Sequence, residues 1–135
     1  MPTAVFDTNV FVAAGFNPRS ASAALIEAVR QGGIALVWTA ATRRETRAVL
    51  TRIPRLSWDE VAGLFRPDTE YPPEAAQDAS FVADPADRKF AALAQAAGAV
   101  LVSADDHLLA HRDKLAVRRP AEFLREVEGR GRADD

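Results

Sequence analysis

The sequence contains no cysteine, and this absence excludes several kinds of site at once. A chain without thiols cannot form disulfides, bind zinc through thiolates or use a cysteine nucleophile. The composition suits a reducing compartment, and we expect a cytoplasmic protein. The sequence also lacks a signal-peptide pattern and any apolar run of membrane-spanning length, so we expect no membrane partner.

An excess of charge of one sign is also lacking, since 17 basic residues nearly balance 19 acidic ones and the net charge is −2. No overall field favours nucleic acid, and binding to it must depend on a local patch or on metal ions. The 135 residues, 48% of them hydrophobic, suffice for one domain with a single core. We expect this domain to span residues 1–128, followed by a polar, glycine-rich, disordered tail at 129–135.

Three apolar runs have the pattern of buried strands. They cover residues 4–6, 34–38 and 99–103, and residues 116–117 form a candidate edge strand. Runs that are continuously apolar, rather than alternating in polarity, are typical of parallel strands covered on both faces. Helical segments alternate with these strands, which predicts an α/β fold with helices on both faces of a parallel sheet.

Capping signals mark where the main helices begin and end. Ser20 and Thr39 precede helical patterns. Asp84-Pro85 is a strong signal for the start of a third helix, which would end at Gly98. A capping-box pattern at Ser57 predicts another short helix. The expected helices are 9–14, 21–31, 40–50, a short one after Ser57, 85–97, 105–109 and 120–128.

Four acidic residues are predicted to meet at one edge of the sheet. Asp7 ends the first strand, and Asp105 follows the strand that ends at Ser103. Asp87 lies in the first turn of the helix before that strand, and Glu45 lies in the second turn of the helix after the second strand. In an α/β sheet these positions share the carboxyl edge, where ligands bind.

This acidic set predicts a metal site. Burying a carboxylate is costly unless it is hydrogen-bonded, paired or bound to a metal, and an all-oxygen ligand set favours Mg²⁺ or Mn²⁺. Such ions activate water and stabilise the oxygens of a phosphodiester during hydrolysis. Basic residues beside the acids could hold a phosphate backbone. They are Arg43, Arg44, Arg47, Arg88 and Lys89.

Four segments in chain order resemble the sequential motifs of PIN-domain nucleases: FDTNVFVAA, TAATRRETRAVL, DPADRKFAALAQAAGA and VLVSADDHLL. The resemblance extends over residues 3 to about 125. More narrowly, the chain resembles the bacterial toxin components of toxin–antitoxin systems that are related to the VapC toxins. The resemblance implies a PIN-like three-layer α/β/α sandwich and a metal-dependent endoribonuclease. It also implies that Mg²⁺ or Mn²⁺ is bound by Asp7, Glu45, Asp87 and Asp105.

The resemblance implies further roles and partners. Asn9 and Ser103 match polar positions that orient ligands or water, and Asp84 would support the site. The partners would be RNA, a cognate antitoxin protein and a second copy of the chain. The sequence departs from the family pattern in having Ser103 for threonine, Ala104 for glycine and His107 for an aspartate that is common there.

Three acids also have a structural interpretation, whereas Asp7 and Asp105 do not, because acids at the ends of apolar strands rarely have a purely structural role. Asp84 is better explained as an N-cap than as a catalytic group. Asp87, in the first turn, would stabilise its helix by roughly 0.3–1 kcal/mol through its interaction with the helix dipole. Glu45, taken alone, would form a surface ion pair. Two other functions stay open: a PIN-fold binding module with weak or no catalysis, and a receiver-like phosphate-sensing domain. The receiver alternative is disfavoured because no aspartate follows the run that ends at Trp38.

Overall fold

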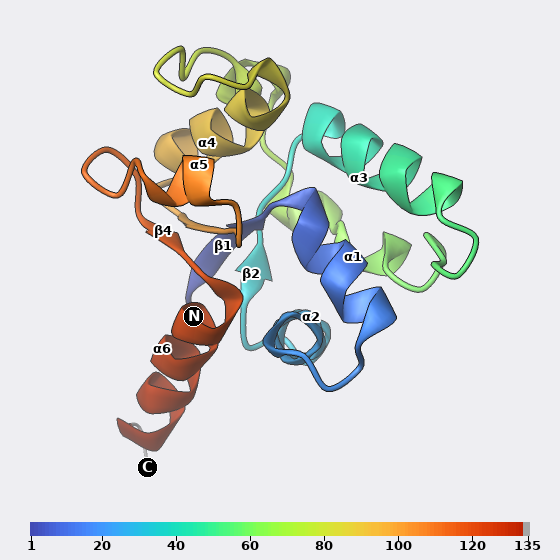
Figure 1. The fold of residues 1–135 in the computed structure, drawn as a ribbon. Coiled ribbons are helices and arrows are strands. Elements are labelled where there is room, and N and C mark those ends of the chain that lie inside the picture. Colours follow the sequence, from blue (N-terminus) through green and yellow to red (C-terminus); the bar gives the residue numbers. More distant parts are fainter. Residues whose placement is uncertain (134–135) are drawn as a thin grey trace.

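A four-stranded, all-parallel β-sheet lies at the centre of the computed structural model, which describes residues 1–133 (Figure 1). Its order is β2-β1-β3-β4, so that β1 pairs with β2 on one side and with β3 on the other. The predicted parallel sheet is therefore confirmed, with β4 at one edge and β2 at the other. The strands are β1 Thr3–Phe6, β2 Ala35–Leu36, β3 Val100–Val102 and β4 Val117–Arg118.

Helices fill the connections between the strands, as expected for parallel pairing. Three short 3₁₀ helices, η1 Ala62–Leu64, η2 Pro67–Thr69 and η3 Pro73–Ala76, lie in the long connection after α3. The α-helices are α1 Thr8–Phe16, α2 Ala21–Arg30, α3 Ala40–Arg52, α4 Pro85–Ala97, α5 Asp106–Leu109 and α6 Pro120–Ala133.

The capping signals act as the sequence predicted. The side chains of Ser20, Thr39 and Asp84 each accept a hydrogen bond from a backbone N–H in the first turn of α2, α3 and α4. Gly98 ends α4 with φ of +61°, the left-handed conformation that glycine adopts without a steric penalty. These caps fix where α3 and α4 begin beside the sheet.

Three expected elements differ in the structure. β2 is only two residues long, because the chain leaves the sheet and Trp38 bridges to Glu70 instead. The helix expected after Ser57 is absent; the carbonyl of Trp58 accepts bonds in tight turns that lead into η1. Helix α6 continues to Ala133, past the expected end at residue 128, and residues 134–135 of the expected tail lie outside the described residues.

The sheet separates two hydrophobic clusters, which gives the predicted three layers. Alternate residues of the strands point to opposite faces: Val5 and Leu101 pack with Phe90 of α4, whereas Phe6 and Val102 pack on the other face. That second face is covered by α1, α2 and α6 (Figure 1). Both faces of the sheet are therefore buried, which explains why its strands are apolar throughout.

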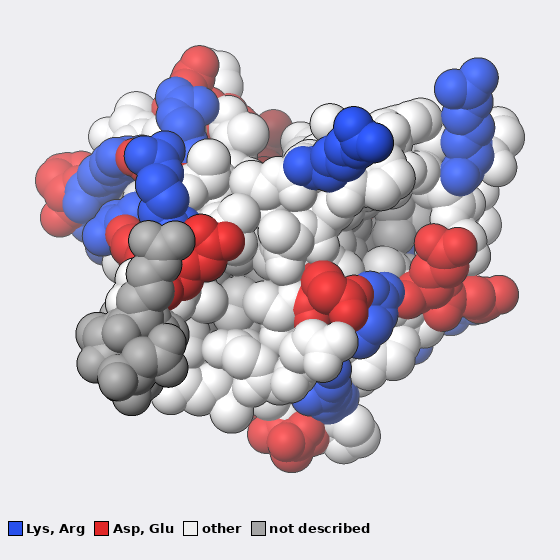
Figure 2. Space-filling view, turned by 90° about the horizontal axis from the view of Figure 1, so that it is seen from below, with Lys and Arg blue, Asp and Glu red and all other residues white. Residues whose placement is uncertain are grey.

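The face that carries α2 and α6 bears charges of both signs. Figure 2 shows acidic and basic side chains scattered over this face among uncharged ones. It therefore offers no surface of a single sign to a polyanion. Within residues 1–133, no helix is both long enough and apolar enough to cross a membrane.

Truncating the core on the α4 face should destabilise the whole domain. Phe90 is 1% exposed, and we expect Phe90→Ala to lower the free energy of unfolding by about 3–5 kcal/mol. Chemical denaturation followed by circular dichroism measures this loss. The exposed Gln95→Ala on the same helix serves as the control, with a change within about 0.5 kcal/mol. Equal stability of the two variants would contradict the assignment of Phe90 to the core.

Candidate active site

Asp7 is a buried carboxylate at the junction of β1 and α1. It is 5% exposed, and its backbone N–H donates to Val102 O at 3.0 Å, which continues the pairing of β1 with β3. Its carbonyl accepts from the Val10 N–H at 2.9 Å and so begins α1. The Ser103 hydroxyl donates to Asp7 Oδ2 at 2.8 Å. Backbone on both sides and one hydroxyl therefore fix this carboxylate at the carboxyl edge.

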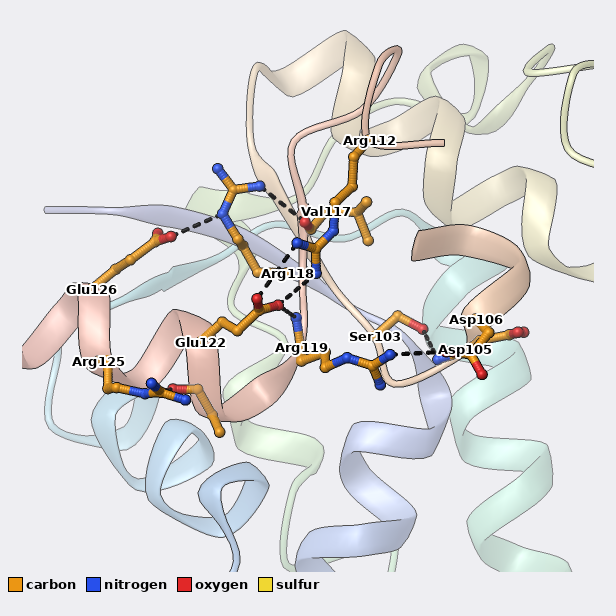
Figure 3. Close-up of polar contacts among 11 residues, drawn as sticks. Ser103, Asp105, Asp106, Arg112, Val117, Arg118, Arg119, Glu122, Arg125 and Glu126 are labelled. Carbon is orange, nitrogen blue, oxygen red and sulfur yellow. Dashed lines mark hydrogen bonds and ion pairs between the residues drawn. The ribbon is translucent and has the colours of Figure 1, made fainter. Parts of the chain in front are cut away.

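Ser103 also connects Asp7 to Asp105. Its hydroxyl oxygen accepts from the Asp105 N–H at 3.0 Å, as the close-up in Figure 3 shows. The Asp105 carboxylate in turn accepts from the His107 N–H at 2.9 Å and caps α5. One buried serine thus holds the ends of β1 and β3 in a fixed relation.

Glu45 reaches the same region from the second turn of α3. The Lys89 ammonium of α4 donates to Glu45 Oε1 at 2.5 Å, and the Thr8 hydroxyl lies 3.5 Å from Oε2. Thr8 is itself buried, and its hydroxyl shares a hydrogen bond of 3.1 Å with Thr46. Both oxygens of Glu45 are therefore engaged by partners from α1 and α4.

The four acids lie near enough to repel one another. Burial raises the pKa of Asp7, and the charges of Asp105 and Glu45 raise it further, although the Ser103 hydrogen bond opposes the rise. Burial also raises the pKa of Asp87, and the nearby carboxylates, Asp7 first among them, bring it to about 6. Shifts of this kind are common where acids gather at a functional site.

The acids are gathered without forming a closed metal-binding group. Among residues 1–133, no three histidine or acidic side chains are arranged to hold one ion. Asp84 Oδ1 accepts from the Ala86 N–H at 2.9 Å as the N-cap of α4, and the charge of Asp84 contributes to the raised pKa of Asp87. Asn9 is exposed on the first turn of α1, and its peptide N–H lowers the pKa of Asp7. The donor chemistry fits a hard divalent cation, and the arrangement is open.

The five basic residues differ in their availability. Arg88 donates to the carbonyls of Val82 and Ala83, which directs its side chain to the chain's own backbone, and Lys89 is paired with Glu45. The guanidinium of Arg43 lies over the Trp58 ring, 5.0 Å from its centroid. The other two, Arg44 and Arg47, are exposed on α3, close to Glu45 in the sequence, and form no ion pair within the described part of the chain.

An ion-pair network beside the site was not predicted from the sequence. Arg119 donates to Asp106 at 2.9 Å, next to Asp105, and its backbone N–H donates to Glu122 (Figure 3). Glu122 also pairs with Arg112 at 2.6 Å. Arg119 directly follows β4, so its place after a parallel strand was the signal that could have located it at this edge.

A family model described as PIN domain matches residues 3–107. The chain belongs to the PIN-domain family. PIN domains are generally nucleases that use divalent metal ions. In this member Asp7, Glu45, Asp87 and Asp105 lie near enough to act on one another's charge. The α/β fold with its parallel sheet agrees with this family. Comparison with curated proteins gave no match.

Neutralising Asp87 should make the metal-free PIN domain more stable above pH 6. Its pKa rises from 3.8 to about 6 on folding, so the folded state holds a proton that the unfolded state has lost. Stability from this group is therefore complete below 3.8 and declines as the pH rises to about 6. We expect Asp87→Asn to melt above the wild type at pH 7 and to lose this advantage toward pH 4.

Melting curves in a chelator at each pH measure this difference. The exposed Asp113→Asn is the matched control, because it removes the same charge away from the acids. The difference in melting temperature between Asp113→Asn and the wild type should vary little between pH 4 and pH 7. If Asp87→Asn and Asp113→Asn follow the same pH dependence, the surroundings of Asp87 at the carboxyl edge do not raise its pKa.

Proposed function

We propose that this PIN domain is a divalent-metal-dependent endoribonuclease and the toxin component of a toxin–antitoxin pair. The observation that supports it is the meeting of four acids from four different elements at one sheet edge, where burial and then the charges of the neighbouring carboxylates raise the pKa of Asp87 to about 6. The proposed partners are RNA, a cognate antitoxin protein and a second copy of the chain.

The proposed ligands of Mg²⁺ or Mn²⁺ are Asp7, Glu45, Asp87 and Asp105. When bound, such an ion lowers the pKa of a coordinated water and stabilises charge on the phosphate oxygens. Asp7 and Asp105 would be presented by the strand ends, Glu45 by the second turn of α3 and Asp87 by the first turn of α4.

The chain's own hydroxyl groups would orient these acids. Ser103 donates to Asp7 Oδ2, and the Asn9 peptide N–H further stabilises that carboxylate. Thr8 lies beside Glu45 and is held by Thr46, so it limits the directions in which Glu45 can turn. In this proposal Ser103 and Thr8 are positioning residues, and no side chain acts as a nucleophile.

The RNA backbone would lie along α3. Arg44 and Arg47 are exposed there, one residue before and two after Glu45, and they line a shallow hollow with Trp38, Arg43 and Glu70. Guanidinium groups in such a place can bind phosphates in spite of the chain's slight net negative charge.

A catalytically weak binding module is the second candidate. It is favoured by the ion pair between Lys89 and Glu45 and by the open arrangement of the acids within residues 1–133. The two candidates share the fold and differ in whether the acids bind a metal ion.

Metal binding and cleavage decide between the candidates. We expect Mn²⁺ to raise the melting temperature of the wild type. At a hundredfold excess over its dissociation constant, the ion should add about 2.7 kcal/mol to the free energy of unfolding. The double variant Asp7→Asn/Asp105→Asn should show no such rise. Asp7→Asn alone should abolish RNA cleavage and raise the melting temperature in EDTA, because it relieves repulsion. Cleavage by a destabilised Asp7→Asn variant would leave Asp7 with a structural role only.

Removing the exposed arginines should weaken RNA binding in a salt-dependent way. Log affinity falls as log salt rises, and for a single strand each phosphate contact contributes about 0.7 to the steepness of that fall. Arg44→Ala/Arg47→Ala should therefore make the slope shallower by about 1.4. Fluorescence anisotropy with a labelled RNA in Ca²⁺ at several salt concentrations measures the slope. Arg52→Ala, at the far end of the same helix, is the control. A double variant with an unchanged slope would remove α3 from the RNA path.

A further inference from the structure

Lys89 is the cation that contacts the acidic set. Its ammonium donates to Glu45 Oε1 at 2.5 Å and to the Ala86 carbonyl at 3.1 Å, and about three-quarters of each side chain of the pair is covered. Within residues 1–133, no other lysine or arginine pairs with one of the four acids. Arg88, the neighbouring cation on α4, is bound to backbone carbonyls instead.

The ion pair occupies a group that a metal ion would need. Glu45 Oε1 is held by Lys89, and Oε2 faces the Thr8 hydroxyl at 3.5 Å, so neither oxygen is free of a partner. This accounts for part of the open arrangement of the acids, because Glu45 is committed to a cation from α4. For Glu45 to ligate a metal ion, the ammonium has to leave it.

The position of Lys89 also explains how the metal-free site tolerates its charges. Asp7, Asp87, Asp105 and Glu45 repel one another, and an ammonium ion inside their field offsets part of that repulsion. A lysine suits this role, since it is a compact point charge on a flexible stem that can move without disturbing its helix.

We propose that Lys89 is a built-in counter-cation that competes with the divalent metal ion for Glu45. The inference rests on the proposed metal site. In the metal-free protein the ammonium holds Glu45, and on metal binding the carboxylate exchanges Lys89 for the ion. The released ammonium then lies at the rim of the site, where it can face a phosphate group. Lys89 is thus a positioning residue that sets the metal affinity.

Calorimetric titration of Mn²⁺ into the whole chain tests this competition. We expect Lys89→Met to bind Mn²⁺ about three- to fivefold more tightly than the wild type, the effect of losing one partly exposed competing ion pair. The same variant should melt at a lower temperature in EDTA. Lys114→Met, which removes the other lysine from the loop before β4, is the control for net charge and should leave the affinity unchanged.

A second background separates competition at Glu45 from general repulsion of the ion. In Glu45→Gln the lysine has no carboxylate to hold, so adding Lys89→Met should no longer tighten Mn²⁺ binding. Tightening of equal size in both backgrounds would overturn the competition. So would a wild type that binds Mn²⁺ at least as tightly as Lys89→Met, although the metal site itself would stand. Absence of Mn²⁺ binding in all variants would overturn the metal site and the competition together.

Discussion

The parallel pairing of β1 with both β2 and β3 is the constraint on which this molecule depends. It brings the carboxyl ends of three strands to one edge, and it requires helical crossovers whose first turns return to the same edge. Residues that are distant in the sequence therefore meet at this edge, where direct contacts of α3 with α1 and with α4 add to the pairing of the strands. The edge collects acids because four elements deliver one each, and the fold has to balance the resulting charge.

Two kinds of compensation balance that charge. Hydrogen bonds from Ser103 and from the first turn of α1 stabilise the buried carboxylate of Asp7, whose pKa burial nevertheless raises. Glu45 is compensated by an ion pair, which costs little at a partly exposed position and can be exchanged. In the proposed metal site the two would act together, because a fixed carboxylate keeps the geometry and a replaceable partner limits the repulsion.

Local signals in the sequence predicted most of the fold. Asp84 and Gly98 delimit α4 through backbone geometry that neighbouring residues determine, so the prediction needed no tertiary information. The pattern at Ser57 was misleading, because turns around Trp58 replaced the helix. The acids were placed at one edge by topology alone, but the pairing of Glu45 with Lys89 joins residues far apart in the chain, and only side-chain positions reveal it.

The serine between the two strand ends divides the acidic site into a rigid and an adaptable half. Asp7 and the backbone of Asp105 share a single hydroxyl, and the strand pairing behind them continues through Val102. A displacement of one of these acids must move the other and the sheet with it. Glu45 and Asp87, by contrast, stand on helices joined through a lysine. Any change in shape when a ligand arrives therefore falls on the spacing of α3 and α4, while the sheet serves as the fixed reference.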